Sequence, residues 1–424
     1  MSGTGKHIII GNSAAALAAV RAIRRAGDDR PIVLVSAENL PAYSPVLTTY
    51  YIAGGISRKN MFLVDADFYR RHRVKTILGR RVVEVDPDRR LVVLGDRTRL
   101  EYGDLLIAAG ASARPLERVA PDAAGLVCTL RTLEDAERIR ALGQKASEVV
   151  VIGAGLVSLQ TVKALLRPGL KITVAVGSDQ VLSQQLDRES AGIIQGRLEA
   201  GGVDILFGRG IDRVTRRGTR VEATTSYGET LPADLVVVGK GVRANTDLVR
   251  GTAIRTGRGV IVDDRMRTSV PDVYAAGDVA EGENQVSGER EVIATWFNAA
   301  AQGEIAGLNM AGRPARRTGQ LRENVTTLLG VVVAVVGQSR PDYGRYEEIK
   351  HLDSRRGVVR KFFFDGPVLA GALLIGSYLD AGVIRHCIAE RLDLSAWKSE
   401  IAATPLDFGK ILAKRGLDLS ISSN

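Results

Sequence analysis

Two short glycine-containing turns are the strongest chemical signal in the sequence. Residues 11–16 (GNSAAA) follow the apolar run at residues 6–10, and residues 153–158 (GAGLVS) follow the apolar run at residues 148–152. A helix pattern comes after each turn. Glycine lets the backbone turn tightly and approach a pyrophosphate, which then lies at a helix amino end where free N–H groups favour negative charge. The two turns therefore predict two dinucleotide sites.

The elements around these turns form two copies of one β-α-β unit. Each helix pattern is followed by another β-branched strand, at residues 32–35 and 172–174. Ser13, Ala16 and Ser158 replace the remaining glycines of the phosphate-binding pattern, and all three are small enough to permit close backbone approach. Either turn alone could be an ordinary strand-to-helix connection, but two in the same context indicate two Rossmann-like domains.

Few residues could do redox or metal chemistry by themselves. The two cysteines, Cys128 and Cys387, cannot form a Cys-x-x-Cys pair, a disulfide framework or a cysteine-ligated metal cluster. The four histidines are scattered along the chain, so we expect structural or solvated histidines and no metal site. Any redox chemistry therefore needs a bound organic cofactor.

The chain changes character from about residue 313 onward. Strand-like runs at residues 326–336, 358–364 and 368–375 precede helical patterns at residues 380–391 and 405–415. This order predicts a third, α+β domain with a packing or dimer-forming role.

The composition is that of a globular protein of two to three domains. The 424 residues carry a net charge of +10, which suits an anionic cofactor, an acidic protein partner or nucleic acid. We expect no nucleic-acid binding, because there is no basic helix or aromatic stacking motif. The start of the chain shows no signal-peptide pattern and the longest apolar stretch is too short for a bilayer, so we expect a cytoplasmic protein without membrane contact.

Four further strings make a family resemblance specific. With the two turns, the sequence resembles the FAD-dependent pyridine nucleotide-disulfide oxidoreductase family. Residues 41–51 (PAYSPVLTTYY) and the C-terminal domain are most similar to the branch of rubredoxin and ferredoxin reductases and nitrite reductase large subunits. The four strings are residues 104–111 (DLLIAAGA), 233–243 (ADLVVVGKGVR), 273–279 (VYAAGDV) and 296–303 (WFNAAAQG).

The resemblance implies an α/β chain with two Rossmann-like βαβ nucleotide-binding domains, for FAD and NAD, plus a C-terminal α+β domain. The FAD-binding domain would be discontinuous, over residues 1–120 and 245–318. The NAD-binding domain would span residues 121–244, and residues 319–424 would form the α+β interface domain.

The resemblance also assigns residues to FAD. Glu38 would bind the adenosine ribose and Asp278 the ribityl chain or pyrophosphate, although Glu38 could be a solvated loop carboxylate and Asp278 a helix cap. The pyrophosphate would be lined by Gly11, Ser13, Ala14 and Ala15, the adenine would meet the backbone of Val82, and the isoalloxazine would lie close to Phe297 and Asn298. The further residues assigned to cofactor binding are Ser44, Pro45, Ala109 and Gly110.

The NAD site departs from the family pattern. Val176, followed by Gly177, stands where an acidic residue would normally hold the ribose 2′-hydroxyl, and Asp179 is the nearest alternative. No arginine follows Val176 closely, so the 2′-phosphate of NADP has no evident partner and NAD is favoured. The residues that the resemblance assigns to this site are Gly153, Gly155, Leu156, Val157 and Gln160, which replaces a frequent glutamate, together with Gly239 beside the nicotinamide.

The activity implied is that of an electron-transfer flavoprotein. NADH would reduce the flavin, which would pass electrons to an iron–sulfur or rubredoxin-like acceptor, and the flow could also be reversed. No acid–base side chain is needed, so no catalytic residue is predicted. No cysteine stands near Val46 and Leu47, where relatives carry a redox-active one, so a thiol mechanism is not expected. The alternative is a non-catalytic FAD-binding scaffold subunit with a decayed NAD site.

The partner follows from the same reasoning. A reductase without its own metal centre needs one beside it, as in the NADH-linked subunit of a phenylglyoxylate dehydrogenase-type complex. Basic clusters at residues 70–73, 216–217 and 313–322 predict attraction of an acidic iron–sulfur protein or subunit. The sequence leaves open whether the chain forms a homo-oligomer or a hetero-complex.

Overall fold

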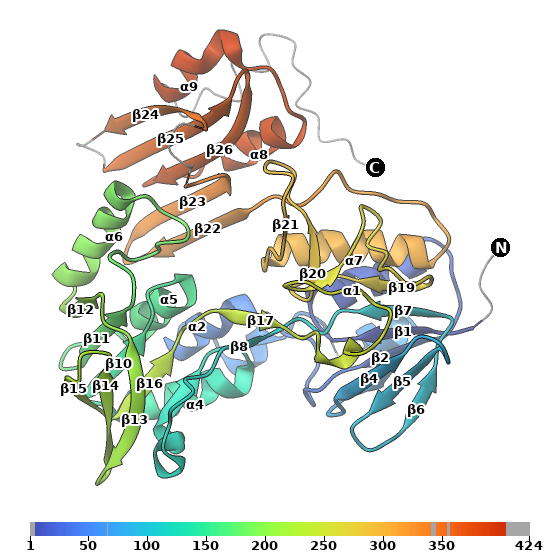
Figure 1. The fold of residues 1–424 in the computed structure, drawn as a ribbon, viewed down its shortest axis with the longest axis horizontal. Helices are drawn as coiled ribbons and strands as arrows, with labels where there is room; N and C mark the ends of the chain where they lie inside the picture. Colours follow the sequence, from blue (N-terminus) through green and yellow to red (C-terminus); the bar gives the residue numbers. More distant parts are fainter. Residues whose placement is uncertain (1–4, 66, 341–344, 354–356, 404–424) are drawn as a thin grey trace. The chain divides into compact units, whose positions relative to one another are not determined.

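The computed structural model describes residues 5–65, 67–340, 345–353 and 357–403. The chain divides into two compact units, each with its own five-stranded parallel sheet (Figure 1). Unit 1 comprises Met1–Ala113 and Val242–Gln320, and unit 2 comprises Arg114–Gly241 and Leu321–Asn424. The chain thus passes between the units three times, and each unit is built from two separate stretches of chain.

The central sheet of unit 1 is buried on both faces. Its strands follow the order β19-β7-β1-β2-β3 and all pairs are parallel. Four of its strands, all but β3, are mostly apolar and buried at every position, as expected for strands covered on both sides. The strands are β1 (His7–Ile10), β2 (Ile32–Val35), β3 (Val74–Ile77), β7 (Asp104–Ile107) and β19 (Val273–Ala275).

Helices α1 (Ala14–Arg25) and α7 (Trp296–Met310) pack together over this sheet (Figure 1). Their contact is close because α7 presents glycines. A Cβ at Gly303 would lie 2.1 Å from the carbonyl oxygen of Ala15, and one at Gly307 would lie 2.6 Å from that of Ala19. Larger residues would push α1 away from its place at the end of β1.

Smaller elements complete unit 1. A three-stranded antiparallel sheet, β4 to β6, follows β3. The remaining bounds are α2 (Thr48–Ile52), α3 (Phe68–Arg71), β4 (Val82–Asp86), β5 (Leu91–Leu94), β6 (Arg99–Glu101), β8 (Ala111–Ala113), β17 (Val242–Ala244), β18 (Val260–Ile261), β20 (Ala280–Glu283), β21 (Arg290–Glu291) and the 3₁₀ turns η1 (Pro45–Leu47), η2 (Arg58–Met61) and η4 (Asp247–Val249).

Unit 2 repeats the plan of unit 1. Its parallel sheet has the order β12-β11-β10-β16-β9, and an antiparallel β13-β14-β15 sheet follows β12. The bounds are β9 (Val127–Thr129), β10 (Glu148–Ile152), β11 (Lys171–Val176), β12 (Val203–Phe207), β13 (Ile211–Arg217), β14 (Arg220–Thr225), β15 (Thr230–Ala233), β16 (Leu235–Val238), η3 (Pro121–Leu126), α4 (Leu133–Lys145), α5 (Leu156–Leu165) and α6 (Arg188–Ala200).

The repetition extends to irregular features. A register shift separates Val82 from Glu84 at the start of β4, and another separates Ile211 from Arg213 at the start of β13. The two copies differ in the fifth strand of the sheet. In unit 1 this strand, β19, follows the other four strands of its sheet in the sequence, whereas in unit 2 the strand β9 precedes them. The predicted pair of Rossmann-like units is therefore confirmed.

The C-terminal part of unit 2 is an antiparallel sheet of order β22-β23-β26-β25-β24 with helices α8 and α9. The predicted run at residues 326–336 proves to be a hairpin, because Leu329 and Gly330 both have positive φ, as a two-residue turn requires. The helical pattern at residues 405–415 lies outside the described residues. The bounds are β22 (Glu323–Leu328), β23 (Val331–Gly337), β24 (Glu347–Asp353), β25 (Val358–Asp365), β26 (Val368–Ile375), α8 (Ala381–Ala389), η5 (Ser395–Trp397) and α9 (Lys398–Ala403).

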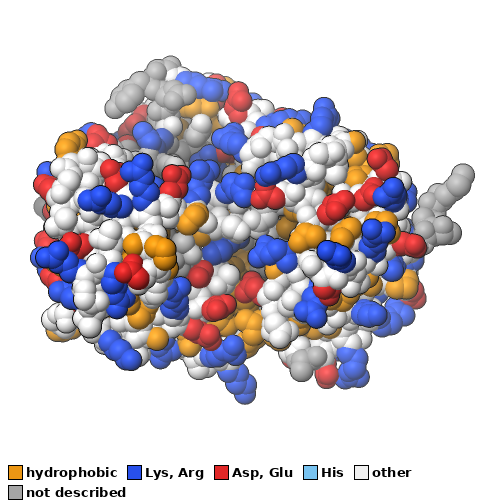
Figure 2. All heavy atoms as spheres, turned by 60° about the horizontal axis from the view of Figure 1, so that its bottom comes forward, with side chains coloured by type: hydrophobic (Ala, Val, Ile, Leu, Met, Phe, Trp, Pro, Cys, Tyr) orange, Lys and Arg blue, Asp and Glu red, His pale blue; other side chains and the backbone are white. Residues whose placement is uncertain are grey.

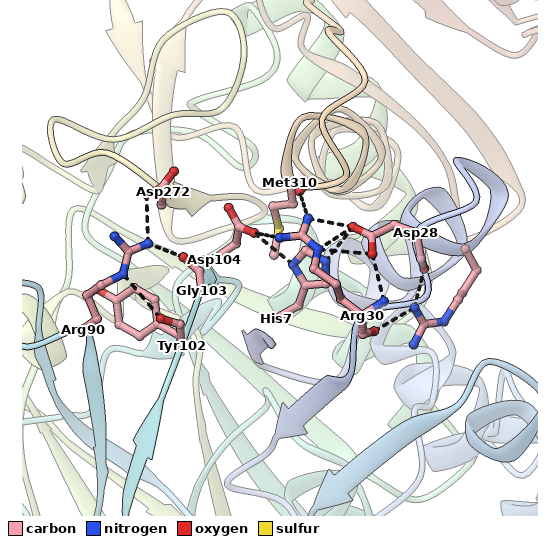
Figure 3. A network of polar contacts seen from close by, with 10 residues as sticks. His7, Asp28, Arg30, Arg90, Tyr102, Gly103, Asp104, Asp272 and Met310 are labelled. Atoms are coloured by element: carbon pink, nitrogen blue, oxygen red, sulfur yellow. Dashed lines mark hydrogen bonds and ion pairs between the residues drawn. The ribbon is translucent and has the colours of Figure 1, made fainter. Parts of the chain in front are cut away.

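A buried ionic network joins the amino ends of β1 and β7 to the carboxyl end of α7 (Figure 3). The fully buried His7 lies with Nε2 3.0 Å from Asp28 Oδ2, and Arg30 donates to Asp28, to Asp104 at 2.8 Å and to the carbonyl of Met310 at 2.6 Å. Burial opposes ionisation of Asp28, but hydrogen bonds from Arg30 and His7 outweigh it and hold the pKa of this carboxyl below its usual range. The network fixes β1, β7 and the end of α7 together.

The Asp28→Asn variant should lower the free energy of unfolding at pH 7 by about 1–3 kcal/mol, because Arg30 and His7 lose their anion. The pKa of Asp28 is lower in the folded state than in the unfolded state, where it is about 3.9. The stabilisation of the folded state by the Asp28 carboxylate is therefore complete above about pH 4 and is lost as the pH falls toward the folded-state pKa. The gap between the wild type and the variant should therefore narrow below about pH 4. Urea titrations at pH 7 and pH 3 measure both effects.

The matched control is Asp29→Asn at the adjacent carboxylate, which is exposed and pairs with Arg73 at the surface. This variant should lose less than about 1 kcal/mol. Equal losses in the two variants would contradict a special role for the buried network.

Candidate functional site

The turn after β1 can contain only glycine at its first position. Gly11 has a φ of +120°, and a Cβ there would lie 2.1 Å from the carbonyl oxygen of Ala108, which follows the neighbouring strand β7. The Gly11 N–H donates to Val35 at the end of β2 at 2.8 Å. The turn is thus held across the carboxyl edge of three strands.

The amino end of α1 fits an anion. Its cap residue, Ser13, is exposed and extended, its side chain makes no capping hydrogen bond, and no acidic residue lies in the first turn. Ala14 and Ala15 are buried behind it. By contrast, α4 carries a Thr132–Asp135 capping box. First-turn N–H groups of α1 therefore remain for a ligand phosphate.

Asp278 lies at the same edge of the sheet, just beyond β19, and is partly buried. The turn before it is fixed by a buried amide relay that the sequence analysis missed. Gln302 of α7 accepts from the Gly277 N–H at 2.7 Å and donates to Gln320 at 3.1 Å. Both glutamines are at most 2% exposed. Two glutamines at buried positions would have been the only sequence signal.

Phe297 and Asn298 have different surroundings. The Phe297 side chain is 66% exposed at the start of α7. Asn298 is buried, and its amide donates to Gln320 at 2.6 Å while its oxygen accepts from Arg317 at 2.6 Å. The Asn298 side chain is therefore a member of the relay, and its predicted contact with flavin stays a prediction.

The expected adenosine side of the first site lies beyond β2 and β3. Glu38 is exposed three residues after β2 and accepts a hydrogen bond from the Tyr43 hydroxyl at 2.7 Å. Its carbonyl accepts from Gly79, and Val82 begins β4 immediately afterwards. Glu38 and the backbone of Val82 thus border the same edge, as their predicted roles require.

The other positions assigned to cofactor binding lie on turns of unit 1. Ser44 is buried and its N–H donates to Met61, while Pro45 begins a 3₁₀ turn. Ala109 and Gly110 lie two and three residues after β7 and are partly buried. Their carbonyls accept from Asn245 at 2.8 Å and 3.0 Å respectively, which fixes this stretch beside Gly11.

The turn after β10 repeats the same steric constraint. Gly153 has a φ of +88°, and a Cβ there would lie 2.5 Å from the carbonyl oxygen of Gly239, beyond β16. Gly155 caps α5 without a side chain, and a Cβ on it would meet nothing within 4 Å. Leu156 is partly buried and Val157 is 53% exposed in the first turn of α5. This turn also presents uncapped N–H groups beside open space.

Gln160 is engaged by the C-terminal sheet. Its amide nitrogen donates to the Thr326 hydroxyl and, at 3.4 Å, to the Thr327 carbonyl of β22. Lys163, one turn further along α5, donates to the same Thr327 carbonyl at 2.9 Å. The predicted contact of Gln160 with NAD therefore stays a prediction, and the contact observed is with β22.

The internal repeat identifies the residue of unit 2 that is equivalent to Glu38. In unit 1, the Gly79 N–H donates to Glu38 at 3.2 Å, and in unit 2 the Gly208 N–H donates to Ser178 at 3.1 Å. The residue equivalent to Glu38 is therefore Ser178. Val176 corresponds to the buried Ser36 and is itself only 3% exposed, so its side chain packs inside the unit, and its predicted place at the ribose stays a prediction.

Ser178 and Asp179 follow β11 at the edge of the second sheet. The Ser178 hydroxyl donates to the carbonyl of Gln180 at 2.8 Å. Asp179 is exposed and pairs with Arg188 of α6. The position that carries a carboxylate in the first copy thus carries a hydroxyl in the second, with an ion pair beside it.

The cysteines are unsuited to redox work. Cys128 and Cys387 are both buried and free, and burial raises the pKa of Cys128 to about 11 and that of Cys387 to about 12. Both are therefore neutral thiols, which are poor nucleophiles. Within the described residues, His, Cys, Asp and Glu side chains form no group of three suited to a metal ion. No described helix is long and apolar enough to cross a bilayer.

Two parallel sheets, each with a glycine turn and an uncapped helix at its carboxyl edge, define a protein that binds two dinucleotides. The chain belongs to the pyridine nucleotide-disulphide oxidoreductase family, whose model matches residues 5–303. It is accordingly an FAD-dependent oxidoreductase of pyridine nucleotides, and the predicted fold class and cofactors, FAD and NAD, are confirmed.

The relatives include electron-transfer reductases. The chain is 31% identical over 413 residues to the NADH-dependent phenylglyoxylate dehydrogenase subunit epsilon of Aromatoleum evansii, covering 96% of both chains. It is 30% identical over 307 residues to a rubredoxin-NAD(+) reductase of Pseudomonas putida, covering 72% of this chain and 80% of that one. The fold matches the crystal structure of the covalent putidaredoxin reductase–putidaredoxin complex with a TM-score of 0.87, 23% identity, and coverage of 97% and 99%.

The open space at Gly155 gives a direct test of the second site. Gly155→Ala should fold with a stability loss below about 1 kcal/mol, since its φ of −77° suits any residue. It should weaken NADH binding by about tenfold, because the added methyl group occupies the approach to the pyrophosphate. Fluorescence titration measures the affinity. Gly192→Ala in α6, also beside open space, is the matched control, and equal effects of the two variants would contradict the site.

The residue equivalent to Glu38 gives a second test. Ser178→Glu should tighten NADH binding by about tenfold, because a carboxylate accepts charge-assisted hydrogen bonds from the ribose hydroxyls. The same change should weaken NADPH binding through repulsion of the 2′-phosphate. Asp179→Asn serves as the comparison. If Asp179→Asn weakens NADH binding while Ser178→Glu does nothing, the ribose is held by Asp179 instead.

Proposed function

We propose that the chain transfers electrons between NAD(H) and an iron–sulfur or rubredoxin-like acceptor through FAD. The observation that carries this proposal is the duplicated glycine turn together with two buried, neutral cysteines. Two dinucleotide sites supply the donor and the flavin, and the absence of an exposed thiol among the described residues leaves the flavin itself to pass electrons outward.

Unit 1 is proposed to hold FAD. Bound FAD would convert the two-electron chemistry of NADH into single-electron steps. Gly11 and the first turn of α1 would receive its pyrophosphate, Glu38 its ribose, and Asp278, fixed through Gln302, its ribityl region. Unit 2 would then bind NAD(H) at Gly153 and Gly155, with Ser178 beside the ribose.

The acceptor is inferred from the relatives. One is named as the NADH-dependent subunit of a phenylglyoxylate dehydrogenase and another as a reductase of rubredoxin. Others are named as ferredoxin–NAD(+) reductase components of dioxygenase systems. An acidic iron–sulfur protein or subunit is therefore the proposed partner, and the cytoplasm, where NADH is available, is the proposed location.

The basic clusters differ in how they are paired. Arg70 and Arg71 lie 3.0 Å and 2.9 Å from Asp67 and Asp65. Figure 2 likewise shows acidic side chains interspersed among the Lys and Arg side chains of one face. Arg313 and Arg316 are exposed and have no ion pair to a described carboxylate. The segment after α7 is therefore the better candidate for attracting an acidic partner.

Anaerobic addition of NADH to the purified protein tests the proposed function. The flavin absorption band should bleach, because the hydride reaches FAD. A band that persists with FAD bound and NADH in excess would support the alternative, a non-catalytic scaffold subunit with a decayed NAD site.

Salt dependence tests the nature of the partner. Reduction of an acidic iron–sulfur protein should slow by about tenfold or more between 0.1 M and 1 M salt, as the Debye length falls from about 10 Å to about 3 Å. Reduction of the flavin by NADH should change little. Stopped-flow traces separate the two half-reactions.

Two double variants locate the surface that attracts the partner. The first combines Arg313→Gln with Arg316→Gln, and the matched control combines Arg70→Gln with Arg71→Gln. The first pair should slow the partner reaction at low salt more than the second. A partner reaction indifferent to salt would contradict steering and indicate a permanent complex.

A further inference from the structure

A buried lysine of the C-terminal sheet lies among carboxylates of the nucleotide-binding part of unit 2. Lys361, in β25, has a side chain only 5% exposed. Its ammonium donates to Asp187 at 2.7 Å and to Glu189 at 2.8 Å, and Glu348 lies 3.8 Å away. Burial alone would lower the pKa of Lys361, but these hydrogen bonds and charges raise it, so the lysine stays charged. None of the proposed cofactor contacts involves this lysine.

Lys361 acts on the start of α6. One oxygen of Asp187 accepts from Lys361, while the other accepts from the Ser190 N–H at 2.8 Å and caps the helix. The same carboxylate therefore fixes the direction in which the chain enters α6. Glu189, in the first turn of α6, is held by Lys361 and also by Lys350 of β24.

Residues 177–187 connect β11 to α6 and are called the β11–α6 segment here. The segment begins beside Ser178, the residue proposed to lie at the ribose. The Ser178 carbonyl is bonded to Gly208, and the Leu182 N–H donates to the Ala154 carbonyl in the middle of the glycine turn at 2.9 Å. Leu182 is buried with a φ of +50°, an unusual conformation for leucine that requires support from its surroundings. Arg340 of the C-terminal part also donates to the Ser183 carbonyl.

Unit 1 anchors the equivalent segment differently. There the Asn12 side chain, in the glycine turn, donates to the Leu40 carbonyl at 3.2 Å. Tyr69 of α3 donates to Asn12 at 2.9 Å and accepts from the Ala42 N–H at 3.0 Å. In unit 2, Ala154 stands at the position of Asn12 and cannot make these side-chain bonds. The C-terminal sheet supplies the support instead.

We propose that Lys361 is a positioning residue for dinucleotide binding: through Asp187 it holds the β11–α6 segment, and thereby Ser178 and the glycine turn, in the geometry that receives the adenosine half of NAD(H). This inference rests on the proposed function of unit 2. It gives the C-terminal sheet a role within the subunit, separate from any role in assembly.

The test measures NADH affinity and segment order in the same FAD-loaded proteins. Lys361→Gln should raise the Kd for NADH by about 2–30-fold, while flavin reduction at saturating NADH stays within about twofold of the wild-type rate. Hydrogen exchange at the Leu182 amide, measured without dinucleotide, should accelerate. Asp187→Asn keeps an acceptor for the Ser190 N–H and should reproduce both effects. The double variant should be no worse than either single variant, because both remove one interaction.

Two comparisons decide the outcome. Lys350→Gln, which removes a more exposed partner of Glu189 alone, should leave the Kd within about twofold. If Lys361→Gln and Asp187→Asn lower the melting temperature but leave both the Kd and Leu182 exchange unchanged, the ion pair is merely structural and the inference is wrong. A wild-type protein that binds neither NADH nor NADPH would overturn the proposed function. Unchanged hydrogen exchange at Leu182 in the Lys361→Gln variant would overturn the positioning role of Lys361.

Discussion

Backbone crowding at two glycines is the constraint on which both nucleotide sites depend. At Gly11 and Gly153 the chain turns so close to the next strand's end that a Cβ would lie 2.1 Å and 2.5 Å from a carbonyl oxygen. Both positions also have positive φ, so two separate steric reasons exclude a side chain. Each glycine turn fixes where the following helix, α1 or α5, begins, and hence where the free N–H groups of that helix point. In unit 1 the same crowding recurs at Gly303 and Gly307, which let α7 hold α1 in place.

The sequence was sufficient to predict the two β-α-β units and their glycine turns, because each unit is built from residues close together in the chain. An apolar run, a glycine turn and a helix pattern define the β-α-β unit, and burial of a parallel strand on both faces makes its sequence continuously apolar. Glu38 and Asp278 lie at strand ends, as expected from the motifs around them. The sequence did not show that Ser178 matches Glu38, because this equivalence comes from the backbone hydrogen bonds of Gly79 and Gly208.

Other features could not be predicted, because the sequence carries no pattern that marks them. The run at residues 326–336 lacks the Asn-Gly or Asp-Gly signal of a tight hairpin, and Leu329 adopts positive φ without one. Strand β24 is an exposed edge strand with four charged residues, so it has no apolar run. The Lys361 cluster joins residues more than 170 positions apart. The Gln302–Gln320 relay spans only 18 positions, but nothing in the sequence marks either glutamine as buried.

The different anchoring of the two copies suits different tasks. In unit 1 the glycine turn, the segment after β2 and helix α3 are tied through Asn12 and Tyr69, all within one stretch of chain. A site built from such local bonds is preorganised and suits a cofactor that stays bound. In unit 2 the corresponding segment depends on an ion pair at Lys361 from a separate sheet. Binding there can be altered without disturbing the parallel sheet that carries the turn. If Lys361 sets the affinity from outside the contact surface, as proposed above, this second kind of anchoring suits a nucleotide that enters and leaves in each cycle.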